Sequence, residues 1–470
     1  MPRLLAWGQT LPGALCLLGC LTLAHFLTTE LESPSRDQLR YVDYAYHLNT
    51  HNTFGLGCGD YSQAPAPGNA NVPLYPLLLA GAASFDNNLN QNYYCALQSQ
   101  GVRGDCLIGT NQEPDQTMPR EPDCPTENFT AVSIVNHILL FVSLVFLYLI
   151  SARLFPHPVL PWLTVLAAFG SGIFTDYSTR ILTENLLLSL FLAMQYALLS
   201  YFRKPGFAAI ATVGVLLALL TLTRPEYPYL ALAAVVIFAA IALWRKQVRL
   251  MLHGLILGLA FILTISPWLV RNQQHFDSWA ISAGNYGEIT LAYRVAYNHM
   301  DARHWLASFV YFLPDFGDSL TQRAFSEEWY WREIDARPGS YQDITNEMLT
   351  ATVSGQLSLN DLLQHHVLAD LPKHLATTIP LSWRGVFIAK YWGLIAFFTY
   401  LVFQYQQLRR GRLELAIIAL PCWLLVGLHA GISINIPRYN LPLFGIYAIS
   451  LGWLLAKIWN RLRPTHRLHC

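Results

Sequence analysis

Apolar segments alternate with polar connections along the whole chain, and the apolar segments have the lengths of membrane-crossing helices. A bilayer span needs about 20 predominantly apolar residues. Ten segments come close to this length: residues 5–27, 131–152, 158–175, 182–202, 206–223, 228–244, 249–270, 386–405, 413–431 and 438–459. Strand-like alternation is scarce between them. The pattern therefore predicts an all-α polytopic membrane protein with about ten transmembrane helices.

Two long stretches, residues 28–130 and 271–385, are too polar to cross a bilayer. Residues 72–85 within the first stretch are apolar but too short for a span, and we expect an interfacial or re-entrant helix there. The sequence predicts three regions. Residues 1–270 form a transmembrane module whose first outer loop, 28–130, is catalytic. Residues 271–385 form a helical extracytoplasmic loop region, and residues 386–470 form the last transmembrane helices and a basic cytosolic tail.

Charge distinguishes the two sides of the predicted bundle. Basic clusters occupy every second connection, and the other connections hold nearly all the acids. The basic residues are Arg203, Lys204, Arg245, Lys246, Arg249, Arg409, Arg410, Arg412, Lys457, Arg461, Arg463 and Arg467. Because Lys and Arg are enriched in cytosolic loops, both termini are expected in the cytosol and the acid-rich loops outside. We therefore predict a protein of the cell's inner (cytoplasmic) membrane with its active site on the extracytoplasmic face.

Composition agrees with a membrane protein. The chain is 53% hydrophobic and 13% charged, against roughly 25% charged residues in soluble domains. The net charge of +1 hides the segregation of charges and gives no indication of a nucleic-acid partner.

Four cysteines lie in the first outer loop: Cys58, Cys95, Cys106 and Cys124. An even number confined to one loop predicts two disulfides formed in an oxidising compartment, with three pairings open. Four free thiols are the alternative. The four lack the C-x-x-C spacing typical of zinc sites.

The first candidate for chemistry is Asp37, which follows the first apolar segment closely. Residues 35–50 have the pattern of an amphipathic helix, with Tyr41 and Leu48 on one face, and we expect it on the membrane surface. Asp37 falls in its first turn, where the helix dipole favours a negative charge. A carboxylate there can act as general base on an acceptor hydroxyl. The alternative is a structural helix-start acid, with Ser35 as the cap.

A second polar group, Asp176, Arg180 and Glu184, lies in a short outer connection. Glu184 is about one turn inside an apolar segment, where an unpaired carboxylate is costly. It therefore either pairs with a cation such as Arg180, at i−4, or faces a polar cavity. In both cases a buried acid on the outer face marks the wall of a cavity.

Three arginines form the third group, at the outer ends of predicted spans: Arg224, Arg271 and Arg438, the last followed by Tyr439. Arginine is disfavoured in short outer connections. The guanidinium fork suits a phosphate or pyrophosphate, so three arginines at one interface indicate a lipid-phosphate site. The alternative for each arginine is snorkelling, or pairing with an outer acid such as Glu226.

These motifs, in this order, resemble the type-C glycosyltransferases. The likeness is to the bacterial branch of glycosyltransferase family 39, which includes protein O-mannosyltransferases and lipid A aminoarabinose transferases. The motifs are Asp37-Gln38 with Tyr41 and Ala45, Val72-Pro73-Leu74-Tyr75-Pro76, the segment ending at Glu184, Thr223-Arg224-Pro225-Glu226, residues 267–272, and Arg438, Tyr439 and Pro442. Gln38 departs from the pattern, because the family often has a second acid there. The cysteine-bearing insert at 86–128 is also unusual.

The resemblance implies a type-C glycosyltransferase fold and inverting transfer of a sugar from a polyprenyl-phosphate donor. The acceptor is an extracytoplasmic glycan, lipid or protein. Asp37 matches the position of the catalytic base.

From their placement we expect Arg438 to bind the lipid phosphate, with Tyr439 beside it and Arg224 or Arg271 assisting. Glu184 positions the sugar or acceptor, or helps to hold a divalent cation, and counts with Asp37 as catalytic. Tyr41 and Asp176 complete the substrate-binding set. No metal-ligand set can be defined, and the expected partners are the donor, membrane lipids and an acceptor of unknown class.

Other functions stay open. A lipid or sugar transporter usually carries charged residues and broken helices near the bilayer midplane, whereas the span interiors here are poor in charge. A polysaccharide ligase or polymerase would use a lipid-diphosphate glycan and arginines without an early acidic motif. A non-catalytic assembly factor with a degenerate site is the third alternative.

Overall fold

The computed structural model describes residues 10–35, 37–57, 61–100, 128–282, 286–325 and 341–462. Every regular element in these ranges is a helix. The chain divides into two compact units, which are described separately below. Unit 1 contains residues 1–283 and 452–470, and unit 2 contains residues 284–451.

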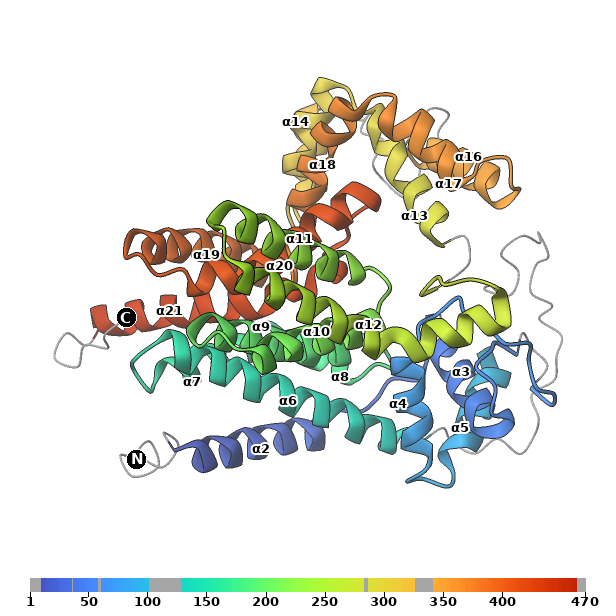
Figure 1. Cartoon of the computed structure of the whole chain (residues 1–470), viewed down its shortest axis with the longest axis horizontal. Helices are drawn as coiled ribbons and strands as arrows, with labels where there is room; N and C mark the ends of the chain where they lie inside the picture. The colour runs from blue at the N-terminus through green and yellow to red at the C-terminus, as the bar shows by residue number, and fades with distance from the viewer. Residues whose placement is uncertain are drawn as a thin grey trace. The chain divides into compact units, whose positions relative to one another are not determined.

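Unit 1 is built around long apolar helices, shown in Figure 1. Helix α6 packs on α9, α9 on α10, and α10 and α11 both pack on α12. Gly214 permits the close approach of α10 to α12, because a Cβ there would collide with the carbonyl oxygen of Leu257. The helices are α2 (Leu11–Thr28), α6 (Thr130–Leu154), α7 (Leu160–Phe169), α8 (Ile173–Ser178), α9 (Glu184–Arg203), α10 (Phe207–Thr221), α11 (Pro228–Arg245) and α12 (Val248–Phe276).

The span predicted at residues 158–175 is not one continuous helix. Helix α7 ends at Phe169, and α8 starts after Gly172, which has a φ of 75°. This left-handed conformation is available to glycine without a steric penalty. The Gly170-Ser171-Gly172 sequence thus breaks an apolar run that hydropathy alone reads as continuous.

Among the described residues, seven helices are long and apolar enough to cross a membrane. They are α2, α6, α9, α11, α12, α20 (Glu414–Ile432) and the continuous segment Pro437–Leu462. Three apolar helices are shorter, namely α4 (Leu74–Ala83), α7 and α10. The prediction of an all-helical, multi-pass membrane protein is confirmed, but the predicted number of ten spans is not.

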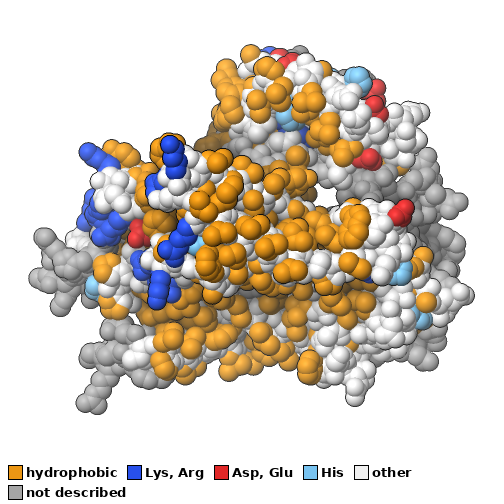
Figure 2. All heavy atoms as spheres, in the orientation of Figure 1, with side chains coloured by type: hydrophobic (Ala, Val, Ile, Leu, Met, Phe, Trp, Pro, Cys, Tyr) orange, Lys and Arg blue, Asp and Glu red, His pale blue; other side chains and the backbone are white. Residues whose placement is uncertain are grey.

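The surface of unit 1 matches this reading. Figure 2 shows many hydrophobic side chains on the surface of α11 and α12. Large apolar side chains on α11 and α12 are exposed, with Trp244 78% and Leu263 71% accessible. The exposed residues Arg245, Lys246 and Arg249 lie where α11 ends and α12 begins. Exposed apolar surface of this kind is suited to lipid rather than water.

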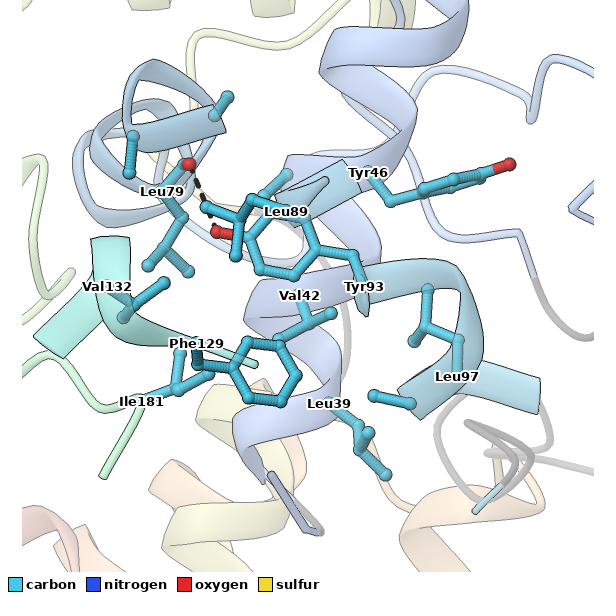
Figure 3. Packing of buried hydrophobic residues seen from close by; sticks show 14 of the residues in the cluster. Leu39, Val42, Tyr46, Leu79, Leu89, Tyr93, Leu97, Phe129, Val132 and Ile181 are labelled. Atoms are coloured by element: carbon cyan, nitrogen blue, oxygen red, sulfur yellow. Dashed lines mark hydrogen bonds between the residues drawn. The ribbon is translucent and has the colours of Figure 1, made fainter. Parts of the chain in front are cut away.

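Three helices of the predicted first outer loop share one core with the start of α6 and with residues at the start of α9. Helix α3 (Asp37–His51) contacts α4 and α5 (Leu89–Gln100). Figure 3 shows Val42, Leu89 and Phe129 within this core, together with Tyr93, whose hydroxyl donates to the carbonyl oxygen of Leu79 at 3.1 Å. The core holds α3 as a buried helix rather than one with a single apolar face. The short helix expected at residues 72–85 is observed as α4.

Cys95 on α5 is disulfide-bonded. Cys58, Cys106 and Cys124 lie outside the described residues, so the predicted pairing stays open. A disulfide in the first outer loop agrees with the predicted oxidising compartment.

Unit 2 is a set of helices joined by a fully buried arginine. Arg294 donates to the carbonyl oxygens of Ala430 (2.6 Å) and His374 (2.9 Å), and to Asn298 Oδ1 (2.9 Å). These bonds tie α13 to α18 and α20. The elements are α13 (Tyr286–Val295), η1 (Ala296–His299), α14 (Ala302–Tyr311), α15 (Gly317–Phe325), α16 (Tyr341–Val353), α17 (Leu359–Asp361), η2 (Leu362–Leu368), α18 (Leu371–Gly385), α19 (Tyr391–Arg409), α20, η3 (Pro437–Leu443) and the first part of α21 (Phe444–Leu462).

Candidate functional site

Asp37 is exposed in the first turn of α3. The next residue, Gln38, is buried, and its Oε1 accepts a hydrogen bond from the backbone N–H of Ile181 at 2.8 Å. This bond fixes the start of α3 against the segment that leads into α9. Gln38 therefore has a structural role here, and Asp37 lies one residue from that anchor.

Glu184, the first residue of α9, is fully buried and pairs with Arg224 at 2.6 Å. Arg224 Nε also donates to Thr183 Oγ1 at 3.3 Å, and Glu226 lies 3.9 Å from its guanidinium. Arg180, the partner considered from the sequence, instead donates to Glu32 at 3.2 Å on the surface. Two predicted site residues, Glu184 and Arg224, are thus brought together although 40 positions separate them.

The charge on Arg224 is stabilised by its neighbours. Burial alone would lower the pKa of Arg224, but the carboxylates of Glu184 and Glu226 raise it above its ordinary value. Tyr41 on α3 is close enough to contribute to the same shift. The Arg224 side chain is only 11% exposed, so its positive charge is held in a largely desolvated site.

Two tyrosines line the same region. The rings of Tyr41 and Tyr75 meet edge to face with centroids 5.3 Å apart. Tyr75 is fully buried and lies within electrostatic range of Glu184. We call Tyr41, Tyr75, Glu184 and Arg224 the tyrosine–arginine cluster. It joins α3, α4, the start of α9 and the link between α10 and α11.

Asp176 is exposed on α8. The chain around it is held by amide side chains: Asn185 Nδ2 donates to the carbonyl oxygen of Tyr177 at 2.9 Å, and Asn136 Nδ2 donates to those of Ser178 (3.2 Å) and Arg180 (3.0 Å). The sequence pattern did not single out these amides. They fix the connection that precedes Glu184.

Arg271, near the C-terminal end of α12, donates to the carbonyl oxygens of Gly68 (2.8 Å) and Phe54 (3.1 Å) and to Asn272 Oδ1 (3.0 Å). Its guanidinium carbon lies 4.6 Å from the centroid of the Trp268 ring. Arg271 therefore contacts the connection between α3 and α4, in the same unit as the tyrosine–arginine cluster.

Asp43 and His47 form a buried pair on α3 that the sequence analysis missed. The Asp43 carboxylate lies 3.2 Å from His47 Nε2, and both side chains are fully buried. Both carboxylate oxygens also accept from the backbone N–H of Gly57, at 3.1 and 3.3 Å. Burial raises the pKa of Asp43, and its hydrogen bonds oppose that shift. The i, i+4 spacing was the only sequence signal for the pair.

Arg438 and Tyr439 lie in η3 of unit 2. A buried polar network fixes this short helix: Asn440 Nδ2 donates to Asn435 Oδ1 at 2.6 Å, and His429 Nδ1 contacts Asn440 Oδ1 at 3.2 Å. The rings of Tyr439 and His429 are 5.7 Å apart. The network holds the backbone that carries both predicted substrate-binding residues.

Metal binding stays a prediction. Among the residues that the structure describes, no group of three or more His, Cys, Asp or Glu side chains is placed to hold a metal ion. Of the candidate ligands, Glu184 is held by Arg224 through one of its carboxylate oxygens.

Comparisons with known proteins give a family match over part of the chain. Residues 126–270 match the family model of dolichyl-phosphate-mannose-protein mannosyltransferases, which agrees with the resemblance predicted from the motifs. A comparison with curated proteins finds no match. Among solved structures, the crystal structure of ArnT from Cupriavidus metallidurans bound to undecaprenyl phosphate is 11% identical, with 97% of this chain and 80% of that chain covered and a TM-score of 0.38. A score this low does not establish a common fold.

Proposed function

We propose that this chain, a multi-pass membrane glycosyltransferase similar to the dolichyl-phosphate-mannose-protein mannosyltransferases, transfers a sugar from polyprenyl phosphate to a hydroxyl on the extracytoplasmic side. The observation that carries the proposal is the tyrosine–arginine cluster beside the start of α3. There Gln38 anchors the helix that begins with Asp37 to the segment preceding Glu184. The proposed acceptor is a glycan, a lipid or a protein.

In the proposed reaction, the Asp37 carboxylate accepts the proton of the acceptor hydroxyl. The hydroxyl oxygen forms a bond to the anomeric carbon as the bond from that carbon to the lipid-phosphate oxygen breaks. The phosphate leaves with the bonding electrons, and attack from the opposite face inverts the anomeric centre. Two features support Asp37 in this role: its exposure to an incoming acceptor, and its position at a helix N-terminus, where a carboxylate is stabilised.

Arg438 is proposed to bind the leaving phosphate, with Tyr439 beside it. A planar guanidinium presents paired donors to phosphate oxygens, and the polar network beneath η3 supports a fixed orientation of this segment. Arg224 adds positive charge, and Glu184 fixes its direction through the pair at 2.6 Å. This pair positions the sugar or acceptor, while Tyr41 and Asp176 provide further contacts.

Asp37→Asn tests the proposed base. General-base catalysis contributes roughly 10²–10⁴-fold, so the variant should insert normally into membranes and lose transfer by about that factor. The assay uses membrane vesicles with defined polyprenyl-phosphate sugars, followed by mass analysis of lipids, glycans and proteins. Glu30→Gln, an exposed acid in the same outer loop, is the matched control. Retention of more than about a tenth of the activity would reject Asp37 as the base.

Arg438→Gln tests the phosphate role. The variant should require a much higher donor concentration for half-maximal transfer, while Arg412→Gln, an exposed arginine elsewhere in the chain, should not. Unchanged donor dependence would reject the assignment. Movement of intact sugar lipid across the vesicle membrane without any glycosylated product would favour a transporter instead.

A further inference from the structure

A single guanidinium holds both ends of a loop between α3 and α4. Arg271 donates to the carbonyl oxygens of Phe54 and Gly68, at 3.1 and 2.8 Å. These two residues also bond to each other, since the Gly68 N–H donates to the Phe54 carbonyl oxygen at 2.7 Å. The chain therefore leaves at Phe54 and returns at Gly68 at one point, and we call the connection between them loop 54–68.

Aromatic rings also pack against Phe54, where the loop begins. Phe54 stacks on Tyr44 of α3 with ring centroids 4.3 Å apart, and meets Trp268 of α12 edge to face at 5.0 Å. The Arg271 guanidinium lies near the rings of Trp268 (4.6 Å), Phe54 (5.4 Å) and Phe276 (5.4 Å). The Arg271 guanidinium thus makes both cation–π contacts and two charge-assisted hydrogen bonds where the loop begins and ends.

The loop is also hydrogen-bonded to α3. The Gly57 N–H donates to both oxygens of the buried Asp43 carboxylate on α3. Gly55 permits the tight path, because a Cβ there would collide with the carbonyl oxygen of Ala66. Loop 54–68 is therefore fastened to α3 by Asp43 and to α12 by Arg271.

The segment after the loop reaches the tyrosine–arginine cluster. The N–H of Leu74, at the start of α4, donates to the carbonyl oxygen of Leu222 at 2.9 Å. Leu222 is two residues before Arg224 in the chain. The described residues 54–57 and 61–74 thus contact α3, the end of α12 and the connection that carries Arg224.

We infer that Arg271 is a positioning residue, which acts on sugar transfer through loop 54–68 and α3 instead of binding the donor phosphate. The inference rests on the proposed function for its catalytic consequence. Its structural part stands on the contacts of Arg271, which donates its hydrogen bonds to protein acceptors within unit 1. Two of these acceptors are backbone carbonyls, each bound by a different terminal nitrogen of the planar guanidinium.

A double-mutant cycle of Gly55→Ala and Arg271→Gln tests the inference. Gly55→Ala displaces the loop and leaves every charge in place. Each single variant should lower kcat by roughly ten- to a hundredfold, the cost of a small misplacement, without raising the KM for the polyprenyl-phosphate sugar. The double variant should be no worse than the more impaired single variant, because both act through one element. Arg249→Gln, an exposed arginine at the other end of α12, is the control.

Hydrogen exchange provides a readout that does not depend on activity. Peptides covering residues 53–57 and 61–68 should exchange faster in both single variants, and also in Arg271→Lys, which keeps the charge but lacks the planar fork. If the wild type transfers no sugar, the proposed function fails. The exchange data alone then show whether Arg271 holds loop 54–68 in place. Unchanged exchange in Arg271→Gln would overturn the inference. A higher donor KM in Arg271→Gln with full activity in Gly55→Ala would overturn it as well.

Discussion

Arg224 in unit 1 and Arg294 in unit 2 are both largely removed from solvent, yet their charges are stabilised in opposite ways. Arg224 has two carboxylates within 4 Å, those of Glu184 and Glu226. Arg294 has only neutral partners among the described residues: backbone carbonyls, an amide oxygen and hydroxyl groups. Acid partners raise the pKa of Arg224 against the effect of burial, whereas burial lowers the pKa of Arg294.

The difference separates two uses of a buried arginine. The positive charge of an arginine paired with acids is balanced by their carboxylates. An incoming phosphate or sugar can alter that balance. An arginine surrounded by carbonyls is a joint between helices, since its hydrogen bonds connect α13 to α18 and α20. Arg271 also binds carbonyls, but it belongs to the same unit as the tyrosine–arginine cluster.

The largest expected effect comes from removing one member of the acid-paired site. Glu184→Gln leaves the charge of Arg224 with only Glu226 at 3.9 Å, and should lower the free energy of unfolding by roughly 3–5 kcal/mol, as for other broken buried pairs. Denaturant unfolding in detergent measures it, with Glu30→Gln as control. The double variant Glu184→Gln with Arg224→Gln should recover part of the loss. A loss below about 1 kcal/mol, the value of an exposed pair, would contradict the comparison.

A smaller loss is expected at the neutral joint. Arg294→Met removes hydrogen bonds from a charged donor but also removes the cost of burying that charge, so the net loss should be about 2–3 kcal/mol. The same unfolding measurement applies. Lys373→Met, an exposed basic residue on α18, controls for the change of side chain. If Arg294→Met lowered the free energy of unfolding by more than Glu184→Gln does, the expected order of the two sites would be wrong.

The smallest effect on the free energy of unfolding is expected at Asp43, a buried acid that pairs with His47 and not with an arginine. Because burial raises the pKa of Asp43, the folded protein binds that proton more tightly than the unfolded chain does. The stability contributed by Asp43 is therefore present at low pH and is lost as the pH rises from 3.8 through the raised value. The free energy of unfolding of the wild type relative to Asp43→Asn should fall across that window.

Thermal unfolding in detergent at a series of pH values measures this difference. Asp277→Asn, an exposed acid, should give a profile parallel to that of the wild type. If the profiles of the wild type and Asp43→Asn are also parallel, Asp43 has no raised pKa in the folded state, and His47 stabilises its charge as fully as an arginine would.

The sequence predicted the long apolar helices well, because the hydropathy signal is local. Helices α6 and α9 start within two residues of the predicted spans. The break between α7 and α8 was missed, since hydropathy carries no information on the positive φ of Gly172. The burial of α3 was missed for a similar reason, because it depends on α4 and α5 packing against it.

Partners distant in sequence could not be predicted. Sequence spacing offered Arg180 for Glu184, whereas Arg224 occupies that position in the structure. Arg294 gave no signal at all, because its acceptors belong to α18 and α20 and appear only once those helices are placed. The catalytic and phosphate-binding assignments of Asp37 and Arg438 stay predictions for the same reason.

The pair of Glu184 and Arg224 also bears on how the protein enters the bilayer. A helix that begins with a bare carboxylate partitions poorly into lipid, so α9 gains a stable place there only when the end of α10 brings its counter-ion. These two segments should therefore leave the translocation channel as a unit rather than one at a time. A polypeptide halted before residue 224 would still carry an unneutralised acid, and we expect it to be recognised and degraded as an incomplete product.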